Sequence, residues 1–70
     1  MKIGDRVTIT DRGQIAAREK HVLASSGIIV DQIIGRRGYF DQIYVKRDNG
    51  GCEWWMLDDW AVAYPPEPAP

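Results

Sequence analysis

The chain contains few of the residues that disulfide, metal and membrane architectures require. Its 70 residues include one cysteine, Cys52, and one histidine, His21. A lone cysteine cannot form an internal disulfide, and this pair alone does not supply a zinc ligand set. No apolar run approaches the length of a membrane span, and no signal-peptide pattern opens the chain. We therefore expect a cytoplasmic protein in a reducing compartment, with no metal, cofactor or membrane contact.

An excess of positive charge is also missing. Nine Lys and Arg residues face ten Asp and Glu residues, which gives a net charge of -1. Nucleic-acid-binding domains usually carry a basic excess, so the composition lowers this expectation and leaves only a local basic patch open. No spacing of a nucleophile and a base indicates a catalytic pair.

The length permits one small domain, near the lower limit at which a single hydrophobic core suffices. We expect this domain to span residues 1–64. The last residues, "PPEPAP" at 65–70, predict a Pro-rich disordered tail, because proline has no N–H to give to a sheet.

Short segments rich in β-branched and aromatic residues predict a mainly all-β fold. The long connection at 11–26 is rich in helix formers and predicts a loop that holds a short helix, with Ile15, Glu19, Val22 and Leu23 on one stripe. "DDW" at 58–60 predicts a 3₁₀ turn. The expected strands are residues 6–10, 27–34, 39–47, 52–57 and 61–64.

The "DNGG" sequence is the strongest hairpin signal, since Asn and Gly tolerate the positive φ angles of a two-residue turn. A loop of Asn49 and Gly50 would pair Lys46 with Glu53, Val45 with Trp54 and Tyr44 with Trp55. This register places Trp54 inside and Trp55 outside. A one-residue slip would mix the two faces, so we expect the alternation to exclude it. The predicted core is Val7, Ile9, Ile43, Val45, Trp54 and Met56, with Trp60 also buried after the 3₁₀ turn.

An exposed Tyr44–Trp55 pair is the kind of amphipathic patch that anchors protein partners. Two alternatives stay open for it: the 11–26 loop covers the tryptophan, or a partner or second copy does. Arg36 and Arg37, between two glycines, are candidates for holding an acidic group, although solvated turn arginines are the simpler interpretation. The candidate binding residues are Tyr44, Trp55, Leu57, Gln42, Lys46, Arg36 and Arg37.

The order of these elements, with "GDRV", "GIIV", "DNGG" and "LDDW", resembles that of SH3-like small β-barrels. Such barrels include KOW and Tudor domains and many small bacterial, phage and plasmid proteins. The resemblance covers residues 2–64. It implies a five-stranded, mostly antiparallel barrel with a long first loop, used as a binding scaffold more often than as an enzyme.

A weaker resemblance is to the plasmid type II dihydrofolate reductases, which share "GDRV" near the start. These enzymes use a Gln-Ile-Tyr triplet to bind folate and a nicotinamide cofactor in a pore formed by four subunits. The chain has this triplet at Gln42, Ile43 and Tyr44, one strand earlier than in that family. We therefore predict a non-enzymatic module that binds a macromolecule, in the first place a protein. An oligomeric reductase and a nucleic-acid-binding barrel are the alternatives, and a homo-oligomer is left open.

The nearly balanced charge generates a first prediction. Duplex DNA should bind weakly or not at all at physiological salt, because the basic residues are matched by acids. Fluorescence anisotropy of a labelled duplex, titrated with protein at several salt concentrations, measures this. Tight binding that falls steeply as salt is added would contradict it and would reveal a concentrated basic face.

Overall fold

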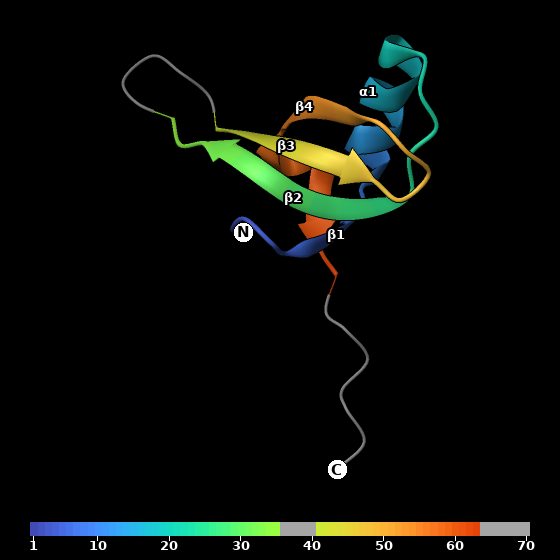
Figure 1. Ribbon diagram of the computed structural model, residues 1–70. Coiled ribbons are helices and arrows are strands. Elements are labelled where there is room, and N and C mark those ends of the chain that lie inside the picture. Colours follow the sequence, from blue (N-terminus) through green and yellow to red (C-terminus); the bar gives the residue numbers. More distant parts are fainter. Residues whose placement is uncertain (36–40, 64–70) are drawn as a thin grey trace.

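The computed structural model describes residues 1–35 and 41–63 (Figure 1). The predictions for Arg36, Arg37 and the tail at 65–70 concern positions outside these ranges. The elements, in chain order, are β1 (Arg6–Ile9), α1 (Asp11–Lys20), β2 (Ser26–Ile33), β3 (Gln42–Arg47), β4 (Cys52–Met56), the 3₁₀ turn η1 (Leu57–Asp59) and β5 (Trp60–Val62).

The strands form one antiparallel sheet in the order β4-β3-β2-β1-β5. Four strands follow one another across the sheet, and β5 returns to pair with β1. The prediction of a mainly β, five-stranded antiparallel fold is confirmed. The predicted closure into a barrel is not seen, because no ladder joins β4 to β5 within the described residues. The sheet is open on that side.

Helix α1 starts directly after β1 and is held there by Thr10. The Thr10 hydroxyl accepts a hydrogen bond from the Gly13 N–H at 3.1 Å and donates to the Asp58 carbonyl at 2.8 Å. The Thr10 N–H donates to the Asp59 carbonyl at 3.0 Å. One residue therefore caps the helix and attaches it to η1. The helix ends at His21, whose left-handed backbone (φ 58°) breaks the helical path.

The predicted helix exists, but it is ten residues long and buries a different face. Its buried residues are Gly13 and Ala17, whereas Ile15 is 59% exposed and Leu23, beyond the helix, is 81% exposed. The reason is close packing against η1: a side chain at Gly13 would collide with the carbonyl oxygen of Asp59. Small residues decide this contact, and of the predicted stripe only Val22, beyond the helix, packs against the core.

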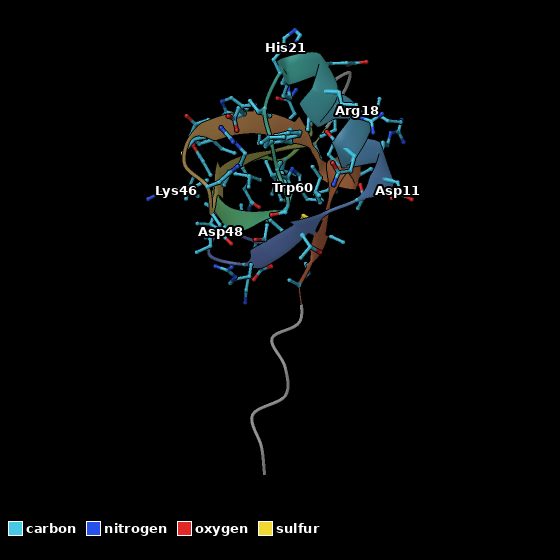
Figure 2. All side chains as sticks on the ribbon, turned by 90° about the vertical axis from the view of Figure 1, so that its right-hand side faces the viewer. Asp11, Arg18, His21, Lys46, Asp48 and Trp60 are labelled. Carbon is cyan, nitrogen blue, oxygen red and sulfur yellow. The ribbon has the colours of Figure 1, made fainter. Side chains whose placement is uncertain are left out.

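The core lies between the inner face of the sheet and α1, and Figure 2 shows Trp60 inside the fold below the helix. The rings of Trp55 and Trp60 meet edge to face, with centroids 5.3 Å apart and an interplanar angle of 85°. Both side chains are 2% exposed. Among the described residues, the buried apolar side chains are Val7, Ala17, Ile29, Ile43, Val45, Trp55 and Trp60.

These burials confirm the predictions for Val7, Ile43, Val45 and Trp60. Ile9 is only partly buried but packs against the core. The predictions for Trp54 and Met56 are wrong: Trp54 is partly exposed and Met56 is 38% exposed. The exchange of Trp54 for Trp55 in the core has a single cause, which is the hairpin register.

The β3–β4 hairpin has a three-residue loop in place of the predicted two-residue one. The Arg47 N–H donates to the Gly51 carbonyl, and the Gly50 N–H donates to the Arg47 carbonyl, both at 3.0 Å. Gly50 and Gly51 adopt φ values of 99° and 85°, which favour glycine. Tyr44 therefore faces Trp54. The expectation that alternation excludes a one-residue slip is therefore wrong, and the slip moves every β4 side chain to the opposite face.

The two neighbouring tryptophans should respond oppositely to truncation. Trp55→Ala removes a fully buried ring from the core and should lower the free energy of unfolding by about 3–5 kcal/mol, enough to unfold a domain of this size. Trp54→Ala should cost far less, because its ring is partly in solvent. Urea denaturation followed by circular dichroism compares them. Equal destabilisation, or a larger loss at Trp54, would contradict the observed register.

Candidate binding surface

The outer face of β2, β3 and β4 carries a pair of aromatic side chains. Tyr44 and Trp54 are cross-strand neighbours with ring centroids 4.9 Å apart and an interplanar angle of 42°. Both are partly exposed. The outer patch, as we define it from the pairing of the strands, consists of Ile33, Gln42, Tyr44, Lys46, Trp54 and Met56.

A bulge in β2 brings this strand into the outer patch. The register against β3 shifts between Ile29 and Asp31, so Val30 is an extra residue in the strand. Beyond the bulge, Asp31 pairs with Tyr44 and Ile33 pairs with Gln42. Ile33 is 49% exposed. The bulge therefore places an apolar and an acidic side chain beside the aromatic pair.

The predicted binding residues are only partly brought together. Gln42, Tyr44 and Lys46 lie on the outer face, as the sequence predicted. Trp55 does not: it is buried in the core, and Trp54 takes its place. Leu57 opens η1 and packs against the core, so it does not belong to the outer patch. Arg36 and Arg37 lie outside the described residues.

Of the two alternatives for Trp55, the structure shows cover by the 11–26 connection, on the inner face of the sheet. Helix α1, which occupies most of the 11–26 connection, places the Lys20 ammonium 5.3 Å from the centroid of the Trp55 ring. Trp54, on the other face of β4, keeps part of its surface exposed. The 11–26 connection thus covers the ring that was expected on the outer face.

An ion pair between Arg47 and Glu53 replaces the predicted pairing of Lys46 with Glu53. The Arg47 Nε lies 2.9 Å from one Glu53 carboxylate oxygen, and its Nη2 lies 2.8 Å from the other. This hydrogen bonding to Glu53 raises the pKa of Arg47. Its Nη1 also donates to the Leu23 carbonyl at 2.8 Å. One guanidinium therefore joins the hairpin to the segment that follows α1.

Asp48 attaches the tip of the same hairpin to two other strands. Its carboxylate accepts a hydrogen bond from the Ser26 hydroxyl at 2.5 Å and from the Arg6 guanidinium at 2.7 Å. The bond from Ser26, followed by the contact with Arg6, lowers the pKa of Asp48. Ser26 opens β2 and Arg6 opens β1. The loop that sets the register is thus tied to the sheet.

Two further sequence expectations can be placed. Gln42 and Tyr44 of the Gln-Ile-Tyr triplet share the outer face, while Ile43 is buried. No group of three or more His, Cys, Asp or Glu residues suited to a metal ion occurs within 1–35 and 41–63. In the same ranges, no helix combines the length and apolar character needed to cross a membrane.

Comparison with known proteins gives no relative for this chain. No family model, curated protein or solved structure matches it. The resemblances to SH3-like barrels and to type II dihydrofolate reductases therefore remain expectations from the sequence, and the site has to be interpreted from its own residues.

The Asp48 network makes stability depend on pH. A carboxyl whose pKa is lowered by folding stabilises the fold above its unfolded pKa of about 3.9, and this contribution is lost as the pH falls through the folded value. The urea midpoint of the wild type should therefore exceed that of Asp48→Asn at pH 6. The gap should close as the pH drops below about 4.

Ser26→Ala serves as the companion variant, because it removes the largest cause of the shift. In the Ser26→Ala background, Asp48→Asn should lower the urea midpoint by a smaller pH-dependent amount. This amount should stay above zero, since Arg6 still contacts Asp48. A difference between wild type and Asp48→Asn that is unchanged from pH 6 to pH 2 would show that the carboxylate does not stabilise the fold through its charge.

Proposed function

We propose that this protein is a non-enzymatic binding module on an SH3-like scaffold, and that it engages a protein partner through the outer patch. The observation that carries the proposal is the Tyr44–Trp54 pair, packed ring against ring on a face that the rest of the described fold leaves partly uncovered. Aromatic side chains contribute a large apolar area together with a polar group, and they dominate the binding energy of many protein interfaces.

The composition of the outer patch supports a protein as the partner. Exposed Ile33 and Met56 lie on either side of Gln42, in the register row next to that of the aromatic pair. Polar and charged residues surround them, with Lys46 on β3 and Asp31 on β2. An apolar centre with a mixed polar rim is the usual organisation of a protein interface.

The strand order supports the SH3-like scaffold. A meander of four strands, a 3₁₀ turn, and a last strand that pairs with the first match the order expected of such folds. In this chain the gap between β4 and β5 is bordered by η1 and α1, which pack together. The scaffold leaves the outer face of the β2–β3–β4 portion available for contact.

The charge arrangement gives less support to a nucleic-acid partner. A basic face would need several cations free to meet phosphates. Three arginines are instead paired with acids: Arg6 with Asp48, Arg47 with Glu53, and Arg12 with Asp58 at 3.7 Å. Such pairing favours a partner recognised by apolar contact.

Replacing Gln42 of the outer patch with a photo-crosslinking residue tests the proposal directly. In a lysate of the source organism it should form an adduct with one protein, which mass spectrometry identifies. Trp54→Ala should weaken binding of that protein at least tenfold, because a buried aromatic anchor commonly contributes about 2 kcal/mol. The same crosslinker at Ala61, an exposed residue on β5, is the matched control.

Adducts of equal yield from both positions would contradict the proposal, as would binding that is unchanged by Trp54→Ala. An adduct with a second copy of the chain would redirect the function from partner binding to self-assembly. Thermal melting of each variant separates a lost contact from a lost fold.

A further inference from the structure

Within residues 1–35 and 41–63, no other strand covers one of the two edges of β4. This strand is the last in the sheet order. The hydrogen bonds from Arg47 to Gly51 (3.0 Å) and from Leu57 to Asp41 (3.4 Å) mark the two ends of its ladder with β3. Because hydrogen-bonded pairs alternate along an antiparallel ladder, the backbone groups of the intervening Cys52, Trp54 and Met56 point away from β3.

Most of these edge groups are available for a new partner. The Met56 N–H donates to the Asp59 carboxylate at 3.0 Å. For the N–H and C=O groups of Cys52 and Trp54, the structure gives no hydrogen-bond partner among the residues it describes. Cys52 is exposed and Trp54 partly so. A free strand edge of this kind is a template for another strand.

A groove between β4 and α1 lies beside this edge. Its walls are Ala16, Glu19 and Lys20 of the helix and Trp54, Trp55 and Met56 of the strand, and its volume is about 360 Å³. A second hollow of about 310 Å³ continues along the helix toward Ile15 and Arg12. The two share Ala16, Glu19, Met56 and Asp59, so they lie next to each other along the helix.

We propose that an extended segment of a partner protein adds to β4 as a further strand and lies in this groove against α1. The inference rests on the proposed function and specifies the form that the partner takes. Backbone hydrogen bonds to Cys52 and Trp54 provide affinity, and side chains that alternate between two sides provide specificity. One side of the added strand meets Trp54 and Met56, and the other meets α1.

The charges of the groove define the chemistry of the segment. Lys20 lies over the Trp55 ring, and no ion pair engages its ammonium among the described residues. An acidic side chain of the partner would complement it. Glu19 and Asp59 also line the groove, so a second acid in the segment is disfavoured. The segment therefore carries one acidic residue toward Lys20 and apolar residues toward Trp54 and Met56.

The dimensions favour a peptide segment over a second copy of the chain. The β4 edge is five residues long, which corresponds to about 17 Å of strand. A stable interface buries about 800 Å² on each partner. A short edge with a helix standing beside it offers a folded copy little further contact, whereas a single extended strand fits between the two walls.

The test begins with a phage library of random dodecapeptides selected on the folded protein. Selected peptides should contain one acidic residue and alternating apolar residues, and a synthetic copy of the consensus then serves as the probe. Failure to select any such peptide would overturn the proposal. Slowed hydrogen exchange of the Cys52 and Trp54 amides in the complex is the expected signature of strand addition.

Removal of the Trp54 N–H with all side chains retained tests the backbone contact. Cys52 permits chemical ligation of residues 1–51 to a synthetic 52–70 segment that carries N-methyl-Trp54. This protein should bind the probe at least tenfold more weakly than the unmethylated ligation product. Lys20→Glu should weaken binding by a similar factor. Lys2→Glu, at an exposed site that does not line the groove, should leave binding unchanged.

The outcomes separate this inference from the proposed function. If the protein crosslinked at position 42 binds the N-methylated chain normally but not Trp54→Ala, strand addition is overturned and the outer-patch function stands. If neither N-methylation nor Trp54→Ala weakens binding, both strand addition and the outer-patch function are contradicted. Sedimentation that shows a dimer, converted to monomer by N-methylation, would assign the edge to a second copy and overturn the peptide proposal. Should methylation unfold the chain, Lys20→Glu with its Lys2→Glu control decides.

Discussion

The conformation of two glycines at the hairpin tip controls the rest of this structure. Gly50 and Gly51 both have positive φ angles, and together they allow a three-residue loop between β3 and β4. The contacts of Asp48 and Arg47 hold that loop against β1, β2 and the segment after α1. Because side chains alternate along a strand, this one local geometry decides which face of β4 enters the core.

The core and the helix position both follow from that choice. With Trp55 turned inward, its ring meets Trp60 edge to face. The sheet is open between β4 and β5 in the described residues, and α1 stands near this opening, with Lys20 over the Trp55 ring. The helix reaches this position because Gly13 and Ala17 allow close packing. An open sheet of this size gains part of its core from a helix.

The same turn produces the surface to which we assign function. It directs Trp54 outward beside Tyr44, and the bulge at Val30 adds Ile33 to the same face. The structural role of Trp55 and the recognition role that we propose for Trp54 thus belong to two adjacent tryptophans. Trp54 and Trp55 point to opposite faces of β4, and the edge that no described strand covers separates these faces. The outer patch and the groove beside α1 therefore meet at one strand.

The sequence by itself determined the strands, the 3₁₀ turn, the burial of Trp60 and the positions of Gln42 and Tyr44 on the outer face, because these depend on local composition and alternation. Only the tertiary structure decided the register of β4 and the buried face of α1. Two registers of "CEWWM" each place a tryptophan against Val45 or Ile43, so alternation cannot separate them. The loop geometry at Gly50 separates the two registers, and a close backbone contact at Gly13 selects the buried face of α1. Such contacts leave no periodic signal in the sequence.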